Sequence, residues 1–177
     1  PFESPEDLIG RVDVAVVAAP TGLHAEVAKP LLEAGIDLLV EKPLAASVED
    51  ARAIVVTARR YGRIVAVGHV ERFNPAWALA CQQSGEPVFI EAARLAPFTY
   101  RSLDVGVVLD LMIHDIDLIL SLIDSPIAAI DAVGSVVVGP HEDTANARLT
   151  FKNGAFANLT ASRVNSEPQR TMQIEGA

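Results

Sequence analysis

The stretch VDVAVVAAPTGLHAEVAKPLLEAGIDLLVEKPLA (residues 12–45) decides the fold. It holds two short apolar runs, at 12–20 and 36–41, on either side of a helical segment, and a third run, RIVAVGH (63–69), follows a second helical segment. Short, nearly continuous runs rich in β-branched residues are typical of parallel strands covered on both faces. The order strand, helix, strand, helix, strand therefore predicts an α/β fold with right-handed crossovers between parallel strands.

Capping residues indicate where the two helices begin and end. Thr21 can cap the first helix at its start, and Gly35 can end it. Ser47 and Asp50 have the spacing of a capping box at the start of the second helix, and Gly62 follows its last turn. These positions place one helix in each connection between the predicted strands.

The alternation of apolar strands and helices stops near residue 70, where we place a domain boundary. The elements expected beyond it are helices starting at Asn74-Pro75 and over 107–123, and strands over 87–96, 130–138, 144–154 and 155–164. Asn153-Gly154 is a strong hairpin signal between the last two strands. We expect the second half of a Rossmann sheet at 1–70 and an α+β domain with a mainly antiparallel open sheet at 71–177.

Composition limits the partners and the compartment. The 177 residues are 50% hydrophobic, enough for a core, and their net charge of −9 disfavours nucleic acids and anionic membranes as partners. The single cysteine, Cys81, cannot form a disulfide within the chain, which favours a reducing compartment. No apolar run approaches the roughly 20 residues of a membrane span. We expect a cytoplasmic protein that binds a small molecule.

A parallel α/β sheet suggests a dinucleotide site, yet none of the eleven glycines forms the G-x-G-x-x-G fingerprint. Its absence fits a chain that holds only the second half of a Rossmann domain, with the phosphate-binding half before Pro1. Three strands with an open edge would also make a poor stand-alone domain. We therefore expect an internal piece of a longer protein, inactive by itself.

Three residues could supply a proton acceptor and a positive donor that stabilises a developing negative charge. Lys42 leaves the carboxyl end of a predicted parallel strand, where open α/β sheets bind ligands, and Pro43 restricts its backbone. Asp110 and His114 are four residues apart and share a face of the predicted helix. Position alone equally allows a surface lysine and a polar pair beside the core.

Other polar residues could bind an anionic ligand, because arginine forks suit a diphosphate. These are Arg72, Asn74, Arg94 and Arg101, although for each residue alone a solvated surface position is the better interpretation. Trp77 and Phe98 could stack on a base or pack in a core. A metal site at residues 114–117 is disfavoured, because adjacent helical side chains diverge by about 100° and no second cluster of ligands exists.

Three strings carry a family resemblance, namely residues 18–45, GHVERFNPA (68–76) and DLMIHDIDL (110–118). In order and spacing they resemble the Gfo/Idh/MocA family of sugar and cyclitol oxidoreductases, and E-K-P after a strand is the most specific mark. The sequences of these strings are most similar to those of bacterial members that oxidise the 3-hydroxyl of UDP-N-acetylated sugars. The resemblance implies NAD or NADP as cofactor, a Gly-rich unit before Pro1 and a sheet that continues beyond Ala177.

The resemblance also implies roles for individual residues. His114 would be the acid/base, with Asp110 beside the same hydroxyl and Lys42 in contact with both substrate and cofactor. The implied cofactor contacts are Pro20, Thr21, His24, Glu41, Lys42 and His69. The implied substrate contacts are Lys42, Arg72, Asn74, Arg94, Asp110 and His114.

Several functions remain open at this point. The first is an NAD(P)-dependent dehydrogenase of a UDP-N-acetylated hexosamine, and the second is a cyclitol or free-sugar dehydrogenase. The third is a non-catalytic sugar or NAD sensor on the same fold, against which the joint presence of Lys42, Asp110 and His114 argues. We also expect a homo-oligomer through the strands of 130–164, because their alternation leaves one face apolar.

Overall fold

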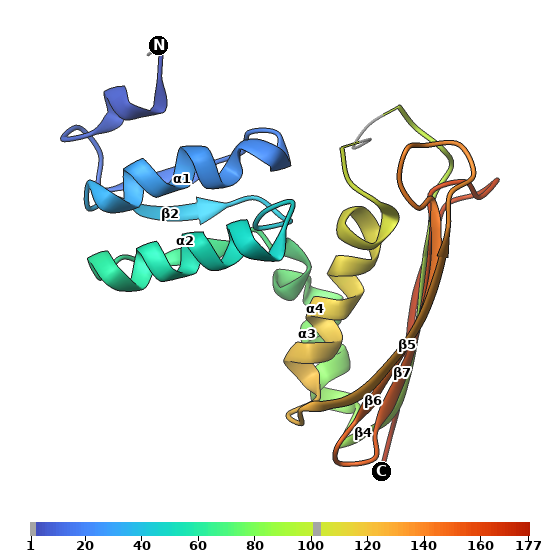
Figure 1. Ribbon diagram of the computed structural model, residues 1–177. Coiled ribbons are helices and arrows are strands. Elements are labelled where there is room, and N and C mark those ends of the chain that lie inside the picture. Colours follow the sequence, from blue (N-terminus) through green and yellow to red (C-terminus); the bar gives the residue numbers. More distant parts are fainter. Residues whose placement is uncertain (1–2, 101–103) are drawn as a thin grey trace. The chain divides into compact units, whose positions relative to one another are not determined.

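The computed structural model describes residues 3–100 and 104–177. The chain divides into two compact units, Pro1–His69 and Val70–Ala177 (Figure 1). Among the residues that the structure describes, none of the helices combines the length and the apolar composition that a membrane crossing needs.

The first unit is a parallel three-stranded sheet with two helices. Its strands follow the order β1-β2-β3, and both pairs are parallel, as predicted. Its elements are η1 (Pro5–Leu8), β1 (Val14–Val17), η2 (Thr21–Leu23), α1 (His24–Glu33), β2 (Asp37–Val40), α2 (Val48–Tyr61) and β3 (Val65–Val67).

Side-chain capping marks the start of α2 but not that of α1. Ser47 accepts a hydrogen bond from the Asp50 N–H at 3.0 Å, and Gly62 ends α2 in the left-handed conformation, so both predicted caps are confirmed. Thr21 is different, because it opens a short 3₁₀ turn and makes no side-chain cap. The helix α1 begins only at His24.

The helices cover one face of the first sheet. Val17, Leu38 and Val40 belong to one buried cluster with residues of both α1 and α2. Val14 and Val16, which point to the opposite face, are 62% and 63% exposed. In the described chain, only one face of this sheet is covered, whereas the sequence pattern is typical of strands covered on both faces.

The second unit packs two helices on a five-stranded sheet of order β5-β6-β7-β4-β8. Only the β4–β7 pair is parallel, so the predicted mainly antiparallel sheet is confirmed. Its elements are η3 (Val70–Phe73), α3 (Pro75–Gln83), β4 (Pro87–Leu95), η4 (Val108–Met112), α4 (Ile113–Leu122), β5 (Ile127–Ser135), β6 (Thr144–Phe151), β7 (Phe156–Ser162) and β8 (Gln169–Gly176). Strand β8 was not predicted.

The helix expected over 107–123 is not uniform. Its first part, η4, has π-helical hydrogen bonds, and regular α-helix begins only at Ile113. The 3- and 4-residue spacing of apolar side chains predicted a helix correctly but could not distinguish these two forms. Single π turns inside α-helices are rare and occur frequently at functional sites.

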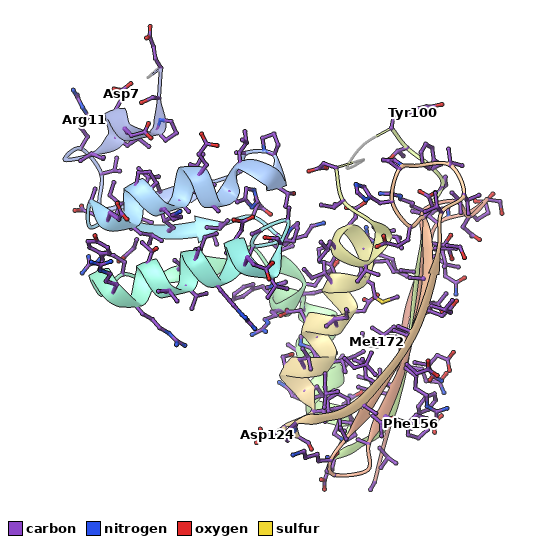
Figure 2. The ribbon with its side chains drawn as sticks, in the orientation of Figure 1. Asp7, Arg11, Tyr100, Asp124, Phe156 and Met172 are labelled. Atoms are coloured by element: carbon purple, nitrogen blue, oxygen red, sulfur yellow. The ribbon has the colours of Figure 1, made fainter. Side chains whose placement is uncertain are left out.

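The two faces of the second sheet differ in chemistry. Ile90, Ala157 and Leu159 form a core with Met112 and Ile119 of the helical segment. Figure 2 shows Met172 on the helix-facing side of the sheet and Phe156 on the other side. The apolar face predicted from the alternation thus exists. The segment of η4 and α4 covers it over β4, β6 and β7, whereas Ile130 of β5, which pairs with the buried Leu149, is 63% exposed. The face left open carries a row of mainly polar residues, Asp131, Arg148, Asn158, Glu91 and Gln173, which are neighbours in register.

Candidate active site

The carboxyl ends of the three parallel strands bring several predicted residues to one edge of the first sheet. Backbone bonds from the Glu41 N–H to Val17 and from the Gly68 N–H to Val40 extend the pairing just past the strands. Parallel strands end at the same edge, which is the edge where open α/β sheets bind ligands. The predicted residues gathered there are Pro20 and Thr21 after β1, Glu41 and Lys42 after β2, and His69 after β3.

The Glu41 carboxylate and Gly68 are in close contact at this edge. A Cβ atom on Gly68 would lie 2.9 Å from Glu41 Oε2, so any larger residue would displace the carboxylate. The same oxygen accepts a hydrogen bond from the Lys42 N–H at 3.3 Å. Lys42 itself is half-buried, and its peptide bond to Pro43 is cis. The backbone of the E-K-P segment is therefore fixed by its own glutamate.

His24 lies in the interior of the first unit and not on a free surface. It is 1% exposed, and its two ring nitrogens lie 3.0 Å from the Pro43 carbonyl oxygen and 2.9 Å from the Ala19 carbonyl oxygen. These contacts favour a positioning role over the direct cofactor contact implied by the family resemblance.

Asp110 and His114 lie on the continuous helical segment of the second unit, Asp110 in the π-helical turn η4 and His114 in the first turn of α4. Both side chains are half-buried, so each retains some access to solvent. The Asp110 N–H donates to the Gly106 carbonyl at 2.9 Å. The change of helix type between the two residues alters the angular spacing that a regular α-helix would give them.

Arg94 forms a buried ion pair with Asp115. The Arg94 Nη2 atom lies 2.7 Å from Asp115 Oδ1, its Nε atom contacts both carboxylate oxygens at 3.2 Å, and Nη1 reaches Glu71 at 3.3 Å. Burial acts to lower the pKa of the Arg94 guanidinium, but the two carboxylates outweigh it and raise that pKa. Its charge is thus balanced internally, which favours a structural role over binding of a diphosphate.

Arg72 and Asn74 also have protein partners. Arg72 contacts Asp117 at 2.6 and 2.7 Å, and this hydrogen bonding raises the pKa of its guanidinium. The Arg72 side chain is still 49% exposed and remains the more accessible of the two arginines. Asn74 caps α3 by accepting from the Ala76 N–H and donates to Glu71.

The two carboxylates that follow His114 in the sequence therefore serve the fold. Asp115 and Asp117 each bind an arginine, as described above. Within residues 3–100 and 104–177, no group of three or more His, Cys, Asp and Glu side chains is placed to hold a metal ion. Of the other sequence candidates, Phe98 packs edge-on against Tyr100, whereas Arg101 lies outside the described residues. Trp77 lines a cavity of about 300 Å³ beside Arg94.

A second buried charge pair, which sequence reasoning missed, fixes the loop between β5 and β6. Asp143 is fully buried and accepts from three consecutive backbone N–H groups, those of residues 137–139, and from Arg163 Nε at 2.8 Å. Burial raises the pKa of the Asp143 carboxyl, but these donors outweigh it and hold the pKa well below its usual range. Arg163 also donates to the Val105 carbonyl and so connects two loops.

Comparisons with known proteins match both units. Residues 1–69 match a family model described as "Oxidoreductase family, NAD-binding Rossmann fold", and residues 48–177 match one described as "GFO/IDH/MocA C-terminal domain". UDP-N-acetylglucosamine 3-dehydrogenase of Acidithiobacillus ferrooxidans is 42% identical over 98% of this chain and 56% of its own length. The NAD(+)-dependent scyllo-inositol 2-dehydrogenase of Bacillus subtilis is 29% identical over 93% of this chain and 52% of its own.

Solved structures agree with these matches. The Acidithiobacillus enzyme superposes with a TM-score of 0.90 at 41% identity, over 99% of this chain and 58% of that one. The WlbA dehydrogenase of Bordetella pertussis, solved with NADH and UDP-GlcNAcA, also gives 0.90 over 99% of this chain and 57% of its own. Its identity of 23% supports the fold alone. The chain spans a little more than half the length of each of these relatives.

Proposed function

Since this chain belongs to the Gfo/Idh/MocA family of NAD-binding oxidoreductases, we propose that the intact protein oxidises the 3-hydroxyl of a UDP-N-acetylated hexosamine. The observation that carries the proposal is the 42% identity over 98% of the chain to an enzyme with this activity. The proposed catalytic residues, Lys42, Asp110 and His114, are all present within the matched chain.

The carboxyl edge of the first sheet suits the cofactor. Glu41 presents a carboxylate there that can accept hydrogen bonds from ribose hydroxyls, and Gly68 leaves it room. The other residues that would hold the cofactor at this edge are Pro20, Thr21, Lys42 and His69. A bound nicotinamide would supply hydride acceptance from the sugar carbon, a chemistry that protein side chains lack.

The side chains would accept the proton that leaves the sugar hydroxyl and stabilise the negative charge that develops on its oxygen. His114 would take the proton of the sugar hydroxyl, a task that suits an imidazole near neutral pH. The Lys42 ammonium would stabilise the negative charge that develops on the same oxygen. Asp110 would hold the hydroxyl or orient the imidazole.

A panel of UDP-sugars tests this proposal on the intact protein. Absorbance of the reduced nicotinamide would be followed with UDP-N-acetylglucosamine, other UDP-hexosamines, free N-acetylglucosamine and inositols. We expect turnover with a UDP-N-acetylated hexosamine and competition by UDP. Oxidation of an inositol without any effect of UDP would replace this function by a cyclitol dehydrogenase, the activity of the scyllo-inositol relative. Binding of NAD without turnover of any sugar would favour a sensor.

We also propose that the protein acts in the cytoplasm as a homo-oligomer. The open face of the second sheet supports the homo-oligomer, because Asp131 and Arg148 form a pair of opposite charges there and no helix of the described chain covers this face. Its composition suits contact with a second copy better than contact with nucleic acid, given the net charge of −9.

A further inference from the structure

One imidazole joins two of the loops at the carboxyl edge of the first sheet. His24 is the first residue of α1, and it reaches the Ala19 carbonyl in the loop after β1 and the Pro43 carbonyl in the loop after β2. Its side chain is 1% exposed, so bulk water does not compete for either contact. The loop that carries the proposed cofactor contacts is thereby fixed to the loop that carries Lys42.

Both ring nitrogens of His24 face acceptors. A backbone carbonyl oxygen can only accept a hydrogen bond, so a ring nitrogen that binds one must carry a hydrogen. Nδ1 lies 3.0 Å from the Pro43 carbonyl oxygen and Nε2 lies 2.9 Å from the Ala19 carbonyl oxygen, and the tautomer of the ring decides which of them donates.

Both residues next to Lys42 therefore make contacts that restrain the backbone. On one side, Glu41 lies against Gly68 and accepts from the Lys42 N–H. On the other side, the Pro43 carbonyl is bound by His24. The first contact is local to the E-K-P segment and strand β3, whereas the second comes from helix α1. The direction in which the Lys42 side chain leaves the backbone depends on both.

We propose that His24 is a positioning residue that places Lys42 for the reaction through the Pro43 carbonyl, an inference that rests on the proposed function of Lys42. It does not require His24 to touch the cofactor or the substrate. Loss of the Nδ1 contact would then lower kcat, because the ammonium would no longer be aligned with the reacting oxygen. The KM for the nicotinamide cofactor would remain near its wild-type value.

Two substitutions separate the two ring contacts in the intact protein. In His24→Asn, the amide nitrogen is three bonds from Cα, as Nδ1 is, and can still donate to Pro43. In His24→Gln, the amide nitrogen is four bonds away, as Nε2 is, and can still donate to Ala19. We expect His24→Gln to lower kcat by about 10²-fold, since small misplacements of a catalytic group have effects of this size, and His24→Asn to retain most of the turnover.

Either of two kinetic results would overturn the proposal. An equal loss of kcat in the two variants, with equal melting temperatures, would mean that the ring acts by packing alone. A rise in the KM for the cofactor with kcat unchanged would mean that His24 contacts the cofactor directly.

The proton on Nδ1 provides a test that needs no turnover. The intact protein would be labelled with ¹⁵N-histidine, and the ring signals of His24 would be identified by their absence in whichever of His24→Asn and His24→Gln folds. We expect Nδ1 to carry the ring hydrogen, and an Nδ1 without a hydrogen would overturn the proposal. Absence of wild-type turnover with every sugar would instead count against the proposed function and leave this nitrogen signal unaffected.

Discussion

Arg94 and Asp115 form a bidentate ion pair in which each side chain is only 7% exposed. The pair joins strand β4 to helix α4, and Glu71 of η3 completes it at 3.3 Å. Removing one partner of a buried pair leaves the other charge buried without compensation, which costs about 3–5 kcal/mol. Arg94 should therefore contribute to stability more than to ligand binding.

We predict that Arg94→Met lowers the free energy of unfolding by about 3–5 kcal/mol, measured by urea unfolding of the intact protein. The matched control is Arg170→Met, because Arg170 contacts the same Glu71 at 3.5 Å but is 72% exposed and should contribute at most about 1 kcal/mol. If Arg94→Met keeps its stability and instead raises the KM for the UDP-sugar, the interpretation of Arg94 as a diphosphate ligand is correct after all.

The acid/base role of His114 predicts a large loss of turnover. His114→Ala in the intact protein should lower kcat by roughly 10²-fold or more, the usual contribution of a positioned general base. His141→Ala is the control, since that histidine is exposed in the loop between β5 and β6 and should leave kcat unchanged. Near-wild-type kcat in His114→Ala would exclude the role.

Lys42 should matter for chemistry rather than for folding. Lys42→Ala removes the ammonium that would stabilise the alkoxide, and a single electrostatic donor of this kind contributes about 10²–10³-fold in kcat. Thermal unfolding should change little, as it should for the exposed Lys29→Ala control, which should also keep its activity. An unfolded Lys42→Ala protein beside a stable Lys29→Ala protein would indicate a structural lysine.

The features that could be predicted from the sequence are those that one type of residue determines in its immediate surroundings, such as a helix end or a turn. Ser47 begins α2 because a hydroxyl can bind a free N–H, and Gly62 ends it because a glycine adopts positive φ. Lys42 lies at the carboxyl edge because an apolar β-branched run stops just before it. The hairpin around Asn153-Gly154 follows from its turn chemistry.

The features that escaped prediction depend on contacts between distant parts of the chain. Asp115 and Arg94 are separated by 21 residues, and either could equally be a solvated surface charge until the strand and the helix pack. The partners of His24 are backbone carbonyls, which every residue possesses, so no residue type indicates them. The π turn at η4 likewise depends on backbone bonding that apolar periodicity does not report.

Asp143 should make stability depend on acid pH. Its pKa is depressed in the folded protein, so its contribution is present above the unfolded-state pKa of about 3.9 and is lost as the pH falls toward the folded-state pKa. Urea unfolding of the wild type should therefore show stability falling between about pH 4 and pH 2. Asp143→Asn should be less stable at neutral pH and lose less on acidification. The exposed Asp124→Asn is the control, and an equal acid slope in wild type and Asp143→Asn would contradict the prediction.

The open face of the second sheet suits a two-fold contact between copies. Arg148 and Glu91 lie in one row across the sheet, one strand to either side of Asn158 in β7. A two-fold axis parallel to β7, lying above Asn158 in the plane of contact, would place each Arg148 opposite Glu91 of a second copy and would bring no like charges of this row together. Such an isologous contact uses the same surface on both subunits.

Charge reversal can test this arrangement. Arg148→Glu should shift the intact protein toward smaller species in light scattering, because two carboxylates would then meet at each position, while adding Glu91→Arg should restore the wild-type size. Arg59→Glu on the exposed side of α2 is the control, and it should leave the size unchanged. Opposite charges also make the contact sensitive to salt, since screening at 1 M reduces the range of such interactions to about 3 Å. A monomeric wild type, or a double variant as small as Arg148→Glu alone, would show that this row does not form the interface.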